Sequence, residues 1–429
     1  VQNWEAISYD NTTRDPHPHA VSLANGKMVI VYEDQDGSDY RIKTATRGTD
    51  GTWAAPVSVE TTTTAPINGQ YPCIVQMPDL SLHLWFWDHG PATVGATPLN
   101  VKMYRSTDDG VTWTLASAQC LTFNDVVSYF VLKATGAGAL MARPGRIRAV
   151  YHEGNVCIVL NPVDNNTGAT SRSVFFQFCS VDGGASWQYV DSTADSDTAD
   201  TGGFHDLVVH GGKVWMSWCR HSDQDLRIRK SSSAFISLFN DTSIEVINGN
   251  AATVSGASMT AGESALVSLP EGELLVFFRD LSGGSGPVVL ALTRDEWSTK
   301  RRSASPVYES STAGTAMYDI SAVRLEGRIA LTHSIISNGY VDDSVAVAYL
   351  GGYTTVEYPQ WEDVSTLTTG LAYRQIQFTT SYLPLDVPGS SGWTATGAGA
   401  DALSAGALSV TGNTTMRNFE RNPGGTVAA

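Results

Sequence analysis

Two acidic segments are the first candidates for chemistry, because the first sets two carboxylates and the second one carboxylate close to a tryptophan. They are "STDDGVTW" at 106–113 and "SVDGGASW" at 180–187. Paired carboxylates can exchange protons with a substrate as a general acid and base. An active site is normally built once, however, whereas these segments are two copies of one pattern. We therefore interpret Asp108 and Asp182 as turn residues, whose side chains accept backbone N–H bonds.

A glutamate, a tyrosine and an arginine form the second candidate set. Glu263 lies nine residues before Gly272, and Tyr318 lies nine residues before Gly327. Each glycine belongs to a hairpin turn, so the equal spacing puts the two side chains at equivalent places in neighbouring repeats. Arg279 follows Gly272 by seven residues, at the end of the returning strand. We expect the three side chains to meet at one cavity.

A repeated β-hairpin must position these groups. It consists of an alternating apolar strand, a turn with Gly and a second apolar strand, and a third strand usually follows. Repeats of roughly 40 to 60 residues are typical of a β-propeller, in which each blade buries its faces against its neighbours. A pair of β-sandwiches is the alternative. The hairpins lie at 19–33, 71–88, 139–155, 205–220, 263–280 and 318–334, which predicts six blades.

The motifs resemble those of one enzyme superfamily. The pattern S-x-D-x-G-x-[TS]-W resembles the Asp box of the sialidase (neuraminidase) superfamily. "GESALVSLPEGELLVFFRD" resembles its segment with a pocket Glu and a substrate-binding Arg, and "MYDISAVRLEGRIAL" resembles the segment with the nucleophilic Tyr. The likeness covers about residues 12–355. It implies an all-β, six-bladed propeller at 1–357, followed at 358–429 by a C-terminal β-rich extension or the start of a second domain.

The resemblance implies an exo-glycosidase that acts on an acidic cell-surface sugar. Sialic acid carries a carboxylate on its anomeric carbon, which would repel an anionic nucleophile, and a neutral Tyr deprotonated by Glu avoids that repulsion. Tyr318 would then attack, with Glu263 as its base. Asp36, in "EDQDGSD" at 33–39, would protonate the leaving oxygen. A solvated acidic loop or a weak calcium loop is the alternative for that segment.

The arginines depart from the family pattern. Sialidases hold the substrate carboxylate with three arginines, because guanidinium groups give both charge and direction. Arg279 stands at a matching place. In "RDPHPHAV", Pro16 occupies the position of the second arginine and Arg14 lies two residues upstream, while "GGSGPVVLALTRD" holds no arginine before its strand. Arg14 and Arg220 are the candidate substitutes.

Aromatic and imidazole groups near the strand ends complete the expected pocket. Aromatic faces stack on sugar rings, so several around one axis would suit a glycan. Each alone is equally well explained by packing. "HPH" at 17–19 lacks a third ligand at zinc spacing, so we expect no metal and no cofactor. The substrate-binding candidates are His17, Tyr71, Trp87 and His205, with His19 and His152 beside them.

Charge and composition exclude several partners. The formal net charge of −16 argues against nucleic acid, since phosphate binding needs clustered Lys and Arg. No apolar run is long enough for a membrane span, and five scattered cysteines predict at most two disulfides. The absence of an initiator Met and the loose end "NPGGTVAA" lead us to expect part of a larger or processed polypeptide, or a homo-oligomer, outside the cell or on a virion surface.

Two other functions remain open at this point. One is a non-catalytic glycan-binding propeller, such as the receptor-binding part of a phage tail fibre or an adhesin, which the missing arginines favour. The other is a propeller polysaccharide lyase that uses His and Tyr, for which "DPHPHAV" is a hint.

Overall fold

The structure is a computed structural model that describes most of the first 350 residues and short pieces beyond them. Within several strands it describes the backbone alone. The described residues are 4–10, 16–36, 39–60, 69–88, 100–122, 142–143, 145–161, 163–164, 174–194, 205–219, 226–238, 244–247, 261–269, 272–280, 288–293, 301–302, 316–325, 328–336, 343–350, 362–363, 400–404, 407–411 and 426–427.

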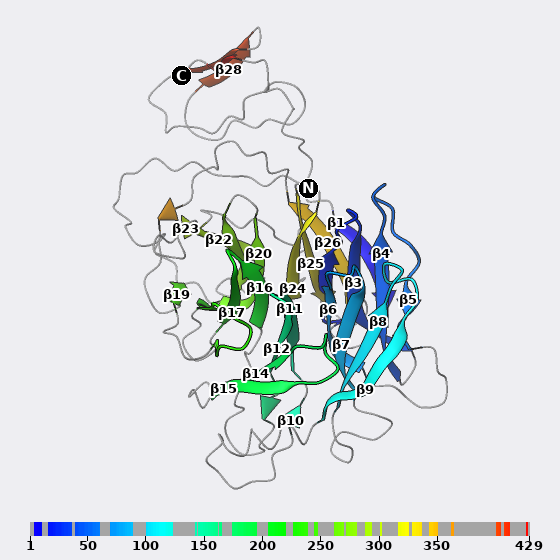
Figure 1. The fold of residues 1–429 in the computed structure, drawn as a ribbon. Coiled ribbons are helices and arrows are strands. Elements are labelled where there is room, and N and C mark those ends of the chain that lie inside the picture. The colour runs from blue at the N-terminus through cyan, green and yellow to red at the C-terminus, as the bar shows by residue number, and fades with distance from the viewer. Residues whose placement is uncertain are drawn as a thin grey trace.

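Five antiparallel sheets have four strands each (Figure 1). The first contains β2 (His19–Ser22), β3 (Met28–Asp36), β4 (Asp39–Arg47) and β5 (Val57–Ser58). The second contains β6 (Gly69–Gln76), β7 (Leu82–Asp88), β8 (Asn100–Ser106) and β9 (Thr114–Thr122). The third contains β11 (Ile147–His152), β12 (Asn155–Leu160), β14 (Val174–Ser180) and β15 (Gln188–Ala194), and the fourth contains β16 (His205–His210), β17 (Lys213–Cys219), β18 (Leu226–Ser231) and β19 (Ile244–Ile247). The last contains β24 (Ala316–Leu325), β25 (Arg328–Ile336), β26 (Asp343–Leu350) and β1 (Trp4–Asp10).

A further sheet has five strands. It contains β20 (Ala261–Ser268), β21 (Leu274–Asp280), β22 (Val288–Thr293), β23 (Arg301–Arg302) and β27 (Glu362–Asp363). The prediction of six blades is therefore corrected: five four-stranded blades are seen in the described part, and the sheet that carries Glu263 differs because β27 pairs with the outer strand β23. Smaller pairings join β10 (Ala142–Arg143) with β13 (Val163–Asp164), and β28 (Ala400–Ser404) with β29 (Ala407–Thr411) and β30 (Thr426–Val427).

The inner strands form a closed series, as expected of a propeller. β2 contacts β6, β6 contacts β11, and the contacts continue through β16, β20 and β24 back to β2. The N-terminal strand β1 completes the last sheet, where it pairs antiparallel with β26 from Trp4↔Ala348 to Asp10↔Asp343. The described residues thus form an all-β propeller that contains no helix, and hence no helix able to cross a membrane.

The core lies between the sheets, because both faces of each blade are covered. Side chains of a strand alternate between faces. Along β12, Val156, Ile158 and Leu160 pack toward the second sheet, whereas Cys157 and Val159 pack toward the fourth. β12, which is covered on both faces, therefore reads as a nearly continuous apolar run. The four cysteines whose side chains are described, Cys73, Cys120, Cys157 and Cys179, form no disulfide.

The two acidic turns behave as the sequence predicted. In the first, Asp108 accepts hydrogen bonds from the Thr112 backbone N–H at 2.8 Å and from its hydroxyl at 2.6 Å. In the second, Asp182 accepts the same pair from Ser186 at 2.9 and 2.6 Å. The hydroxyl bond from Ser186, followed by its N–H bond, lowers the pKa of Asp182 to about 2. These carboxylates stabilise their own turns.

Candidate axial site

Charged side chains gather where the inner strands of several sheets begin. We call the set Arg146, Glu263, Arg279 and Asp319 the axial cluster. All four are buried, with exposed fractions of 2 to 5% for their side chains. They come from three sheets: Arg146 precedes β11, Glu263 and Arg279 lie on β20 and β21, and Asp319 lies on β24. A propeller is needed to bring them together.

Glu263 contacts both arginines of the axial cluster and the backbone of β24. Arg279 Nη1 donates to its Oε1 at 2.6 Å, and the backbone N–H of Ile320 donates to its Oε2 at 3.1 Å. Arg146 Nη2 lies 3.7 Å from the same Oε2. The carboxylate is thus held by two guanidinium groups and by the strand that carries Tyr318.

Asp319 continues the chain of charges toward the first sheet. Its Oδ1 accepts a hydrogen bond from Arg146 Nη2 at 3.3 Å, and its Oδ2 lies 3.6 Å from His17 Nε2. The other ring nitrogen of His17 lies 2.8 Å from Glu33 Oε1. His17 also packs on the Tyr71 ring, with centroids 4.1 Å apart. Two sequence candidates, His17 and Tyr71, are therefore adjacent and border the cluster.

Local backbone distortions aim several of these side chains. The register of the inner hairpins shifts between Gln70 and Cys73, between Ala261 and Ser264, and between Tyr318 and Ser321. Tyr71 and Asp319 adopt φ angles of 54° and 53°, and His17 one of 44°. Such left-handed conformations are unfavourable for residues other than glycine, and β-bulges commonly re-aim side chains beside active sites. The distortions occur at the inner ends of three sheets that face this cluster.

A second buried ion pair lies beside the cluster. Arg148 Nε is 3.2 Å from Asp206 Oδ1 in an ion pair without hydrogen-bond alignment, and Asp206 Oδ2 accepts the Leu266 N–H at 2.7 Å. Burial, together with the nearby Arg146, lowers the pKa of Arg148 to about 10, and burial raises the pKa of Asp206. Burial, with Arg148 and Arg146 nearby, also holds the pKa of His19 well below its usual value. His19 is therefore neutral at pH 7.

Two of the predicted binding residues lie in the core instead. Trp87 is 1% exposed and donates its indole N–H to the Gly145 carbonyl at 2.8 Å. His205 is fully buried, with Nε2 3.1 Å from the Val159 carbonyl and Phe175 against its ring. Neither ring presents a face on which a sugar could stack. The side chains of Tyr318 and Asp36, and the whole of Arg14 and Arg220, lie outside the described residues.

Sequence reasoning missed Arg146, Asp319 and Glu33. The count back from a turn glycine worked for Glu263 because its turn has the same five-residue form as that of the first sheet. The turn of the β11–β12 hairpin consists of Glu153 and Gly154 alone. Counting nine residues back from Gly154 therefore reaches Gly145 and misses Arg146 by one residue. Asp319 follows Tyr318 directly, but only its positive φ turns its side chain to this cluster.

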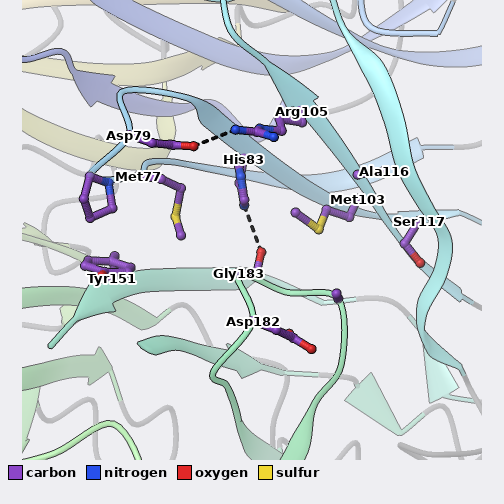
Figure 2. A pocket seen from close by; sticks show the side chains of 12 residues that line it. Met77, Asp79, His83, Met103, Arg105, Ala116, Ser117, Tyr151, Asp182 and Gly183 are labelled. Atoms are coloured by element: carbon purple, nitrogen blue, oxygen red, sulfur yellow. Dashed lines mark hydrogen bonds and ion pairs between the residues drawn. The ribbon is translucent and has the colours of Figure 1, made fainter. Parts of the chain in front are cut away.

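The second feature of note is a pocket at the opposite ends of the inner strands. It lies between the second and third sheets and has a volume of about 490 Å³ (Figure 2). Its walls include Met77 and Asp79 from the β6–β7 turn, His83, Met103 and Arg105 from the following strands, and Tyr151 from β11. None of these residues belongs to the axial cluster.

Comparisons with known proteins identify the fold but find no family by sequence. No protein-family model and no curated protein matches the chain. Among solved structures, a Trypanosoma rangeli sialidase in complex with 2,3-difluoro-KDN is 13% identical with a TM-score of 0.52, over 81% of this chain and 57% of its own. A Penicillium chrysogenum alpha-L-arabinanase complexed with arabinobiose is 14% identical with a TM-score of 0.56, over 82% of this chain and 98% of its own.

A protein of unknown function from Dyadobacter fermentans matches to a similar degree, at 13% identity and a TM-score of 0.56, over 81% of this chain and 97% of its own. The chain thus spans little more than half of the sialidase and nearly all of the other two. At these identities the likeness concerns the fold alone. The protein therefore has the sialidase-like β-propeller fold that its motifs implied.

Proposed function

We propose that the protein is a sialidase-like exo-glycosidase that cleaves an acidic sugar from cell-surface glycans at the axial cluster. In this proposal Tyr318 attacks the anomeric carbon, Glu263 takes the phenol proton, and Asp36 protonates the leaving oxygen. Arg279 binds the substrate carboxylate, assisted by Arg14 or Arg220. The five-stranded sheet serves as the sixth blade, and the protein acts outside the cell.

One observation carries the proposal. The Glu263 carboxylate accepts the N–H of Ile320, two residues beyond Tyr318, while Arg279 holds its other oxygen. The proposed base, a guanidinium and the strand that carries the proposed nucleophile are therefore in contact. Arg146, a buried guanidinium within 4 Å of both Glu263 and Asp319, offers a positive charge that the sequence pattern did not supply. Guanidinium groups bind carboxylates through charge-assisted hydrogen bonds.

A second candidate function is a glycan-binding propeller without turnover, such as the receptor-binding part of a phage tail fibre. It is favoured by the same ion pairs: Arg279 and Arg146 are already neutralised by Glu263 and Asp319. A substrate carboxylate would have to compete with these carboxylates. In this reading the aromatic pair of His17 and Tyr71 provides the sugar contact.

Release of 4-methylumbelliferone from its α-sialoside tests the proposal. We expect turnover by the wild type and a loss of at least a hundredfold in Tyr318→Phe and Glu263→Gln. Tyr349→Phe is the matched control, because Tyr349 lies on β26 under the Arg47 guanidinium, away from the axial cluster. Binding on a glycan array without turnover would favour the second candidate, and a product that absorbs as an unsaturated uronate would favour a lyase.

A further inference from the structure

We call the contact between the first and second sheets the first junction, and the contact between the second and third sheets the second junction. The two junctions have the same backbone arrangement, but they differ in one group of side chains. At each junction an acidic turn of one sheet rests on the hairpin of the sheet before it. Asp109 of the first turn corresponds to Gly183 of the second, since "STDDGVTW" and "SVDGGASW" align residue by residue. The supporting hairpins also align: Leu23 and Lys27 exchange the same backbone bond as Met77 and Ser81, at 2.8 Å in both.

The first junction is closed by the Asp109 side chain. Its Oδ2 accepts hydrogen bonds from Lys27 Nζ at 2.7 Å and from Asn25 Nδ2 at 2.9 Å. At the second junction all three partners are replaced. Gly183 stands for Asp109, Ser81 for Lys27 and Asp79 for Asn25. The second junction therefore lacks both the carboxylate that Asp109 provides and the ammonium group that Lys27 provides. Because one negative and one positive charge are lost together, the loss of this pair leaves the net charge unchanged.

The pocket is the space that this exchange leaves. A Cβ built on Gly183 would lie 3.5 Å from His83 Cε1 and 4.0 Å from Met77 Cε, so a side chain there would enter the pocket. Figure 2 shows Met77 and Met103 on either side of His83, and Tyr151 facing Met77. His83 Nδ1 lies 2.9 Å from the Gly183 carbonyl, which holds the turn in place.

The lining combines an apolar floor with a paired polar rim. Met77 and Met103 are nearly buried, and Tyr151 adds a half-buried ring. Asp79 Oδ2 and Arg105 Nη2 form an exposed pair at 2.6 Å. Both carboxylate oxygens of Asp182 are already bound within its own turn, and burial lowers the pKa of His83. Two carboxylates, Asp79 and Asp182, and one guanidinium, Arg105, therefore line the walls.

We propose that this pocket is a second carbohydrate site, which takes a neutral mono- or disaccharide on the face opposite the axial cluster. Its volume falls in the range of small-molecule sites, which are largely apolar with a few placed polar groups. A neutral sugar offers an apolar ring face for Tyr151 and the methionines, and neighbouring hydroxyls that both donate and accept. Asp79 and Arg105 supply an acceptor and donors side by side. An anionic sugar would meet one carboxylate more than it meets guanidinium groups, and Arg105 is already paired with Asp79.

The test is a titration of the full chain with glucose, galactose, mannose, N-acetylglucosamine, lactose and maltose, followed by NMR saturation transfer and calorimetry. We expect at least one sugar to bind with a Kd in the millimolar range. Gly183→Asp should raise that Kd at least tenfold by restoring the plug of the first junction. This variant is expected to fold, because Asp109 has a φ of 59° and Gly183 one of 70°.

Tyr151→Ala should weaken binding to a similar extent, and Glu263→Gln should leave it unchanged. Thermal unfolding of each variant checks that the propeller is intact. Absence of binding by all six sugars, or equal binding by folded Gly183→Asp, overturns the proposal. Loss of binding in Glu263→Gln would assign the sugar to the axial cluster instead. A failure of sialoside turnover bears only on the proposed function, since it does not involve this pocket.

Discussion

Replacement of Arg146 by Met should be among the most destabilising single changes at the axial cluster. Its guanidinium lies 3.3 Å from Asp319 and 3.7 Å from Glu263, and the side chain is 2% exposed. With an effective dielectric constant of about 20, unit charges at 3.3 and 3.7 Å attract by roughly 5 and 4.5 kcal/mol. The variant also avoids the cost of removing the guanidinium from water on folding, which offsets much of this attraction and leaves a net loss of about 3 to 5 kcal/mol.

The remaining partners reduce that loss toward its lower end. Glu263 keeps Arg279, and Asp319 keeps His17 at 3.6 Å. A buried carboxylate that has lost its cation can escape its charge by taking up a proton. The deficit of Arg146→Met should therefore be largest at pH 7 and should shrink as the pH is lowered toward 4. Arg146→Lys, which keeps the charge, should recover a large part of it.

Denaturant unfolding at pH 7 and at pH 4.5 measures both effects, with Arg105→Met as the control. Arg105 also pairs with an aspartate, at 2.6 Å, but the two side chains are 46% and 56% exposed. Exposed pairs contribute less than about 1 kcal/mol. If Arg146→Met costs no more than Arg105→Met, or if its deficit is the same at both pH values, the axial cluster is not a buried charge network and the reasoning fails.

Two further predictions concern pH and the acidic turns. Burial, opposed by a hydrogen bond to the Ser334 carbonyl and aided by the nearby Arg279, lowers the pKa of His333 to about 4. The unfolded chain then takes up the proton first, so about 3 kcal/mol of stability present above pH 6.5 should be lost as the pH falls toward 4; His333→Phe should flatten this part of the unfolding free energy curve, and an unchanged curve would contradict the assignment. Asp182→Ala removes the acceptor of two turn bonds and should lower the thermal midpoint by about 2 to 4 °C, whereas Glu153→Ala, at an exposed turn position, should leave it unchanged; equal shifts would show that Asp182 does not stabilise its turn.

The architecture could be read from the sequence because it repeats. The hairpins share a strand period of two, and those of Glu263 and Tyr318 each have a glycine nine residues later, which indicated equivalent positions. The contact between Glu263 and Arg279 follows from that count. The turn role of Asp108 and Asp182 was legible for the same reason, since a local hydrogen-bond pattern depends on neighbours in the chain.

The composition of the axial cluster could not be read in this way. Arg146 escaped because a shorter turn shifts the count, and Asp319 because a β-bulge reverses the face to which a residue points. Trp87 was assigned to a binding surface since a strand end looks the same in sequence whether it borders a cavity or another sheet. Which side chains meet between sheets depends on how the sheets pack around the ring. A pattern of neighbouring residues in the sequence contains no information on that packing. The fifth strand β27 depends on a pairing of two residues, Glu362 and Asp363, with β23.

The pairing of β1 with β26 also governs the order in which the molecule can form during synthesis. β1 leaves the ribosome before the other strands of the propeller, yet its partner, at Asp343–Leu350, is made only after the inner strands of the other sheets have emerged. Until then its backbone donors and acceptors must be satisfied by water or by a chaperone. Contacts so distant in sequence make folding slow. The first of the described strands to be made is thus paired only after the inner strands of all the sheets have been made.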